Sequence, residues 1–242
     1  MKCTPINDLS KGKLIPLLMY SSFEDYFGCE NNLERIELLI KTILKKEGIQ
    51  SVKVLRKLDA RHNEDDDSIG IVDVECLCDG KNVNVEVIAS YIKTDNYNTF
   101  THACELSSRD VDFSIENPEY YENLNKTIQI VLSPYGEEYG QYILRDVDDP
   151  KYVYSDILKI ININTLYYAS RCLDNSSSIL DKVVGVIAIT DEDKLEELTK
   201  DLEEYKDLVD SVKTYSNIDT IISKYDKEKY LDNINKYESS AS

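Results

Sequence analysis

Hydrophobic and polar residues alternate most regularly between residues 69 and 90, where two β-rich segments flank Asp79-Gly80. An Asp-Gly pair between alternating segments is a strong β-hairpin signal, because both turn positions tolerate positive φ. In the second segment the even-numbered positions form the more polar face and include Glu86 in mid-strand. In the first segment Asp73 lies among isoleucine and valine, where an unpaired carboxylate would be costly to bury. The pattern predicts a hairpin with one carboxylate on each strand, and Asp73 needs a partner, a metal or a solvated cleft.

A helix is expected before this hairpin, and further strands after it. Residues 33–46 repeat apolar side chains at helical spacing behind Asn31 or Asn32, and Gly48 ends the pattern. β-rich runs predict the remaining strands at residues 51–58, 127–132, 139–145 and 155–165. The mixed stretch 94–113 predicts a loop and a helix. This order predicts an α/β fold with a mixed central sheet flanked by helices.

The C-terminal quarter has a different pattern from the rest of the chain. Residues 190–213 and 217–237 are strongly charged outside a narrow apolar stripe, which predicts two helices that each pack with one face. Residues 176–189 are compatible with a helix or a strand. We therefore predict a core over residues 16–170 and a mostly helical C-terminal region over residues 171–238. That region is a candidate for binding a protein partner or for self-association.

The hairpin resembles the active-site hairpin of PD-(D/E)XK nucleases, in the form typical of recombination-promoting nucleases and putative transposases. In that group an Asp-Val pair precedes a D-G-K turn, and a Glu follows between hydrophobic residues. The matching segments here are Asp73-Val74, Asp79-Gly80-Lys81 and Val85-Glu86-Val87. The aromatic segment 23–44 and the strand region 139–164 are similar to the same group. The resemblance implies a restriction-endonuclease-like core with a helical C-terminal extension.

The resemblance also implies a chemistry. In this group the residues matching Asp73 and Glu86 hold Mg²⁺ or Mn²⁺, hard cations that prefer oxygen ligands, and the metal promotes hydrolysis of a DNA phosphodiester bond. A Gln or Lys two residues after the Glu orients the attacking water, but this chain has Ile88 there. The departure predicts a catalytically weakened or inactive endonuclease, because loss of one positioned polar group costs on the order of 10² to 10⁴ in rate.

Three interpretations of the carboxylate pair stay open. The first is an active Mg²⁺-dependent endonuclease whose polar helper has moved to Ser90, His102 or Arg109. The second is a degenerate nuclease fold that serves in binding or regulation, and the third is a pair of incidental sheet carboxylates. A non-enzymatic scaffold that uses the acidic helical tail is the alternative function. An accessible concave site with basic residues around it would favour the enzyme.

Composition narrows the possible partners and the compartment. The 28 Lys and Arg against 46 Asp and Glu give a net charge of −18, which is unusual for a protein that grips DNA phosphates, although residues 41–61 are locally basic. The six Cys form no CxxC pair, as expected of reduced thiols in the cytoplasm. Neither a membrane-spanning apolar run nor a signal-peptide pattern is present in the sequence, so we expect a cytoplasmic protein.

Overall fold

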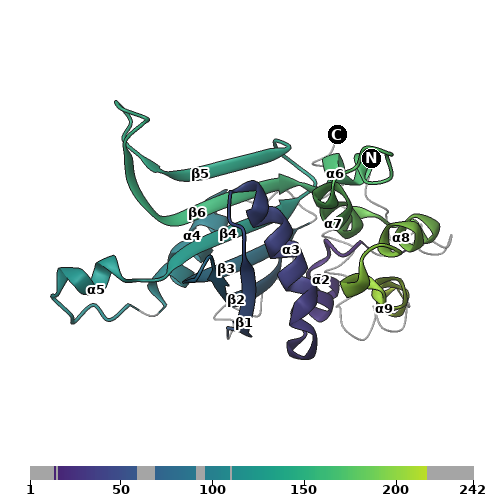
Figure 1. The fold of residues 1–242 in the computed structure, drawn as a ribbon, viewed down its shortest axis with the longest axis horizontal. Coiled ribbons are helices and arrows are strands. Elements are labelled where there is room, and N and C mark those ends of the chain that lie inside the picture. The colour runs from purple at the N-terminus through teal and green to yellow at the C-terminus, as the bar shows by residue number, and fades with distance from the viewer. Residues whose placement is uncertain (1–13, 15, 59–68, 91–95, 110, 217–242) are drawn as a thin grey trace.

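The computed structural model describes residues 14, 16–58, 69–90, 96–109 and 111–216, and its centre is a mixed six-stranded sheet flanked by helices (Figure 1). The strand order is β1-β2-β3-β4-β6-β5. β1, β2 and β3 are antiparallel, β4 runs parallel to β3 and β6, and β5 is antiparallel to β6. The strands are β1 (Val52–Lys57), β2 (Ile69–Cys78), β3 (Lys81–Ser90), β4 (Lys126–Ser133), β5 (Tyr139–Arg145) and β6 (Val153–Asn164). The expected α/β class with a mixed sheet is confirmed.

The turn between β2 and β3 fixes the register of the hairpin. Asp79 has φ 46° and Gly80 has φ 80°, the positive values that a two-residue hairpin turn requires. The Asp79 carboxylate also accepts hydrogen bonds from the backbone N–H groups of Gln50 and Ser51, the latter at 2.8 Å. β2 and β3 are therefore paired along their whole length, as the alternation predicted.

One face of the sheet carries the main hydrophobic core. Helices α2 (Tyr20–Phe27) and α3 (Leu33–Lys46) pack on it beside β1 and β2, and α6 (Thr165–Arg171) and α7 (Ile179–Ala188) continue the layer. The strands contribute alternate buried aliphatic residues, among them Val74, Val85, Ile130 and Ile161. Gly48, with φ 84°, follows the end of α3 as predicted.

The opposite face is covered mainly by α4 (Asn96–Ser108), which connects β3 to β4 and lies behind the sheet in Figure 1. Ala103 and Leu106 of α4 are buried, as are Ile88 of β3 and Val131 of β4. These four side chains are not part of the main core cluster. They form a small separate apolar layer, so the two faces of the sheet are packed independently.

Residues 171–216 fold back onto the main core. The helices are α7, α8 (Glu192–Thr199), the short 3₁₀ helix η2 (Glu203–Tyr205) and α9 (Leu208–Tyr215). Arg35 of α3 forms an ion pair with Asp207 and lies over the ring of Tyr26, 4.2 Å from its centroid, while the Tyr205 hydroxyl donates to the Arg35 carbonyl. The described C-terminal helices therefore share one hydrophobic core with α2 and α3.

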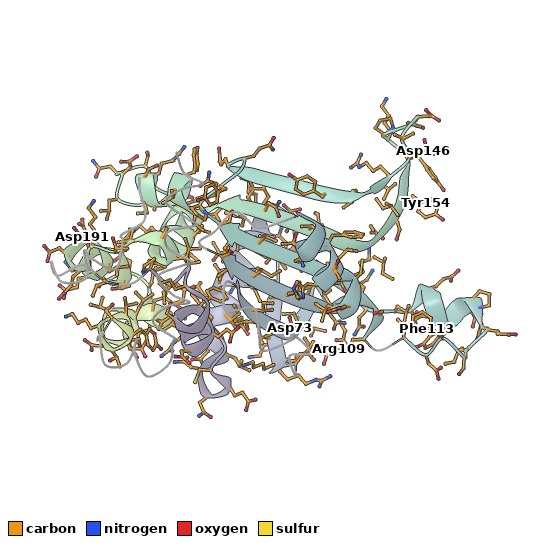
Figure 2. All side chains as sticks on the ribbon, turned by 180° about the vertical axis from the view of Figure 1, so that it is seen from behind. Asp73, Arg109, Phe113, Asp146, Tyr154 and Asp191 are labelled. Carbon is orange, nitrogen blue, oxygen red and sulfur yellow. The ribbon has the colours of Figure 1, made fainter. Side chains whose placement is uncertain are left out.

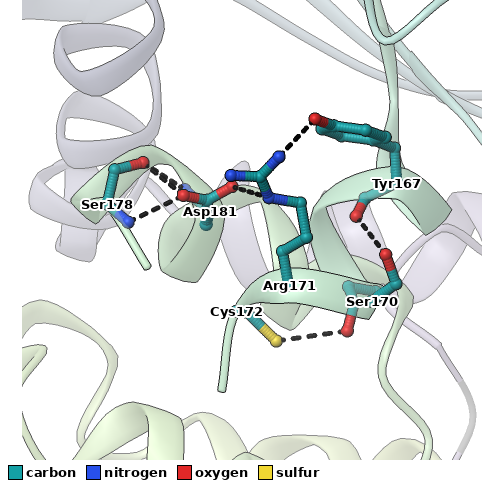
Figure 3. Close-up of polar contacts among 7 residues, drawn as sticks. Tyr167, Ser170, Arg171, Cys172, Ser178 and Asp181 are labelled. Atoms are coloured by element: carbon teal, nitrogen blue, oxygen red, sulfur yellow. Dashed lines mark hydrogen bonds and ion pairs between the residues drawn. The ribbon is translucent and has the colours of Figure 1, made fainter. Parts of the chain in front are cut away.

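Helices α6 and α7 are joined by polar contacts (Figure 3) and pack closely at Gly185. Arg171 lies 3.6 Å from a carboxylate oxygen of Asp181 and donates to the Tyr167 hydroxyl, and Asp181 caps α7 by accepting from Ser178. A Cβ on Gly185 would lie 2.7 Å from the Cys172 Cβ, so only glycine permits this helix spacing.

One prediction from the sequence needs correction. The single helix expected over residues 190–213 is wrong, because the chain turns at η2 to bury Tyr205 and divides the segment into α8 and α9. The aromatic segment 23–44 contains the last residues of α2 and the 3₁₀ helix η1 (Glu30–Asn32), and the short helix α5 (Pro118–Glu122) precedes β4. Residues 176–189 contain helix α7. The helix predicted at 217–237 lies outside the described residues.

No helix in the described part of the chain has the length and apolar character needed to cross a membrane.

Candidate functional site

Asp73, Glu86 and Gln129 form a polar row across three neighbouring strands. Asp73 of β2 is directly opposite Glu86 of β3, and Glu86 is the register partner of Gln129 on β4. Directly opposed residues project from the same face of a sheet, with Cβ atoms about 5 Å apart in an antiparallel pair. The two predicted carboxylates therefore lie side by side on the face covered by α4.

A cation and an amide hold the two carboxylates. Arg109, which follows α4, donates from Nη2 to Oδ2 of Asp73 at 3.1 Å (Figure 2). The Gln129 side-chain nitrogen donates to Glu86 and also, at 2.6 Å, to the backbone carbonyl of Thr99 in α4. The polar row therefore contacts Thr99 within α4 and Arg109 just after the end of this helix.

The polar row is closed to solvent. Asp73 is 2% exposed, and Glu86 and Gln129 are 0% exposed. The Arg109 side chain is 10% exposed. Arg56 of β1 reaches the same face but pairs with Glu75 at 2.7 Å. A DNA phosphate would need α4 to move before it could reach either carboxylate.

Protein groups occupy positions at the two carboxylates that a divalent cation would need. Two neighbouring carboxylates are suitable ligands for Mg²⁺ or Mn²⁺, but the Arg109 guanidinium occupies the position beside Asp73, and the Gln129 amide presents hydrogens to Glu86. Among the described residues, no group of three or more His, Cys, Asp or Glu side chains is placed to hold a metal.

Of the polar helper residues proposed from the sequence, the described contacts bring Arg109 to the carboxylate pair, as the first interpretation allowed. Ser90 lies on the same face but four residues beyond Glu86 and opposite Ile69. His102 is partly exposed, with Nδ1 3.9 Å from a Glu105 carboxylate oxygen. Glu34, another carboxylate, is exposed on α3, which packs on the opposite face of the sheet.

Ile88 belongs to a neighbouring apolar row. Its register partners are Ile71 on β2 and Val131 on β4, and it is 0% exposed. The position where the nuclease pattern has Gln or Lys is thus part of the small apolar layer under α4. A charged side chain there would be buried among aliphatic groups, which is costly without a partner.

Gln129 is the functional-site residue that sequence reasoning missed. It lies in the middle of β4, where alternate residues Thr127, Gln129 and Ser133 are polar and buried while Ile128 and Ile130 belong to the main core. A buried polar residue in mid-strand is the same signal that singled out Glu86. Applying the alternation test to every strand would have found it.

A second feature on this face is an apolar groove of about 500 Å³ between α4 and the β5–β6 hairpin. Its walls include Phe100 and Cys104 of α4, Phe113, Leu144 and Ile160. Burial and the neighbouring Glu105 raise the pKa of the Cys104 thiol. The groove is lined by neither Asp73 nor Glu86, so it is separate from the polar row.

Comparison with protein-family models, with curated proteins and with solved structures finds no match for this chain. The function must therefore be argued from the site itself.

Proposed function

We propose that this protein is a divergent PD-(D/E)XK nuclease-like protein that no longer cleaves DNA and in which the former metal-binding carboxylates stabilise the fold. The observation that carries the proposal is the closed polar row, in which Arg109 pairs with Asp73 and Gln129 with Glu86 beneath α4. A buried carboxylate pair held by one cation and one amide is suited to holding α4 on the sheet rather than to meeting a phosphate.

The chain topology supports the nuclease-like part of the proposal. The order α3, β1, β2, β3, α4, β4, with antiparallel β1 to β3 and parallel β4, follows the helix, strand, hairpin, helix, strand order expected from the resemblance. Asp73 and Glu86 occupy directly opposed positions on the hairpin. The restriction-endonuclease-like fold, a cytoplasmic location and any contact with DNA belong to this proposal.

The loss of cleavage has two supports. Ile88 provides no group that could orient water and is sealed in an apolar row. Gln129, the register partner of Glu86 on β4, contributes its amide nitrogen to α4 as well as to Glu86. Both features favour the degenerate interpretation over an enzyme whose helper has moved.

The test compares the natural protein with Glu86→Gln, which keeps the shape of the side chain and removes its charge. Both proteins are incubated with supercoiled plasmid and either Mg²⁺ or Mn²⁺. We expect no metal-dependent nicking by either protein and a lower denaturation midpoint for the variant. Metal-dependent nicking by the natural protein that disappears in Glu86→Gln would contradict the proposal. Ile88→Lys is a poorer test, because it would bury a charge at a fully enclosed position.

A non-enzymatic binding role is the second candidate, and the apolar groove favours it. Large exposed apolar patches on soluble proteins commonly mark interaction surfaces. The C-terminal helices are less suited to this role, because Leu195 and Leu198 of α8 and Leu208 and Val212 of α9 are buried in the main core.

A further inference from the structure

Exposed hydrophobic side chains gather at one end of the molecule. Of the twelve large hydrophobic residues that are exposed in the described part of the chain, eight lie on α4, the following loop and the β5–β6 hairpin. They are Phe100, Phe113, Tyr142, Leu144, Val147, Tyr152, Val153 and Tyr154. Figure 2 shows the hairpin tip with Asp146 and Tyr154 and the loop with Phe113 projecting at this end. We call these eight residues the arm surface.

The groove within the arm surface contains little that could recognise a polar ligand. Among the described residues that line it, the polar side chains are the hydroxyls of Ser107, Ser108 and Ser155 and the Tyr142 phenol, and none is charged. Small-molecule sites usually combine apolar walls with a few placed polar or charged groups. The composition therefore favours another apolar protein surface as the occupant.

The two edge strands of the sheet differ in how well they are protected against pairing with a strand of another chain. The β1 edge carries Lys53, Arg56 and Lys57 and has an irregular register, features that discourage pairing with another chain. β5 also has an irregular register after Tyr142, but its one charged residue is Arg145 at the end of the strand. Among the described strands, β5 has β6 as its single neighbour. The less protected edge thus borders the arm surface.

The size of the arm surface matches an interface between two copies of this chain. Eight large apolar side chains, each exposing roughly 100 Å², amount to roughly 800 Å², which is about what each partner contributes to a standard protein interface. Leu144 is 58% exposed and Tyr154 is 71% exposed, so other parts of the same chain do not bury these side chains.

We propose that the arm surface is the interface of a homodimer, in which a two-fold axis brings the hairpin of each copy against the groove of the other. A two-fold interface requires a self-complementary patch, and a concave groove beside a projecting apolar hairpin provides one. This inference does not depend on whether the protein cleaves DNA. The net charge of −18 opposes association of two copies, and salt screens that repulsion. The dimer therefore becomes tighter as ionic strength rises.

Sedimentation velocity of the full chain over a range of concentrations and salt tests the proposal. Leu144→Glu places a charge on the arm surface, and Leu55→Glu is the matched control on the β1 edge, where the leucine is 46% exposed. We expect Leu144→Glu to raise the dissociation constant by on the order of tenfold or more, and Leu55→Glu to leave it unchanged. Circular dichroism verifies that both variants are folded.

Thiol labelling provides an independent measurement, because Cys104 is exposed and lines the groove. Mass spectrometry of the Cys104 peptide should show slower alkylation as the natural protein is concentrated, and no such slowing in Leu144→Glu. A natural protein that stays monomeric at high concentration and high salt would overturn the proposal and leave a different protein as the occupant. A dimer weakened equally by Leu55→Glu, or one that dissociates as salt rises, would also overturn it.

Discussion

The two faces of the central sheet are built by alternate residues of the same strands, yet they are packed in different ways. On one face the strands present aliphatic side chains such as Val85 and Ile130 to a continuous layer of helices. On the other face the same strands present Glu86 and Gln129 to a single helix, beside an open groove. The first face provides most of the apolar burial, and the second holds the buried polar row and the open groove on which the proposals for function rest.

Under the proposed nuclease-like ancestry, this comparison shows how a catalytic hairpin could become structural. The backbone positions of Asp73 and Glu86 are set by hairpin register and by the core on the opposite face, so they persist whatever chemistry they serve. What changes is the layer above them. Arg109 places a cation beside Asp73, Gln129 donates a hydrogen bond to Glu86, and Ile88 extends the apolar layer under α4.

The largest expected effect comes from breaking the ion pair on the α4 face. Arg109→Met keeps the aliphatic part of the side chain and removes the cation from Asp73, which is 2% exposed. Removing one member of a buried pair typically costs about 3–5 kcal/mol, because the other charge stays buried. Urea denaturation should show this loss, and adding Asp73→Asn to the variant should restore part of it.

Arg145→Met is the control for this prediction. Arg145 is exposed and donates to the Pro150 carbonyl at 2.7 Å, so its replacement should change stability by no more than about 0.5 kcal/mol. If Arg109→Met costs no more than Arg145→Met, the ion pair under α4 does not stabilise the fold, and the structural role proposed for Asp73 fails.

Replacing one residue type on the two faces tests the packing difference directly. Leu132→Ala opens a cavity in the main core, where the leucine is 0% exposed, and should cost about 2–5 kcal/mol. Leu144→Ala on the arm surface should cost about 0.5 kcal/mol or less. Denaturation at low protein concentration keeps association from contributing. Equal losses would mean that the groove side is as tightly packed as the core.

The smallest expected effect concerns the turn between β2 and β3. This turn sets the hairpin register, and a slip of one residue would move every side chain of a strand to the other face of the sheet. The backbone N–H groups of Ser51 and then Gln50 bond to the Asp79 carboxylate and lower its pKa below the ordinary value. A depressed pKa means that the charged form stabilises the fold above the unfolded-state pKa, near 4, and that this contribution disappears as pH falls through the folded-state pKa.

Asp79→Asn isolates this charge, because asparagine tolerates the same positive φ and keeps one acceptor oxygen. The natural protein should therefore have the higher melting temperature at pH 7, and the difference should shrink to nothing at acidic pH below the folded-state pKa. A difference that stays the same at acidic pH would show that the conformation of the turn, rather than the carboxylate charge, is responsible.

Local patterns in the sequence determined much of this protein. The Asp79-Gly80 turn and the alternation around it fixed the hairpin and predicted one carboxylate on each strand, because strand periodicity and turn chemistry act over a few residues. The same local rules placed helix α3, strand β4 and most of β6.

Only the tertiary structure decided what surrounds those carboxylates. Contacts of Asp73 with Arg109 and of Glu86 with Gln129 join residues 36 and 43 positions apart, and local patterns do not specify which residues meet across such separations. The break between α8 and α9 likewise depends on Tyr205 and Asp207 meeting α2 and α3 across the fold. Burial and charge compensation depend on long-range packing, and they separate a buried structural pair from an open catalytic one.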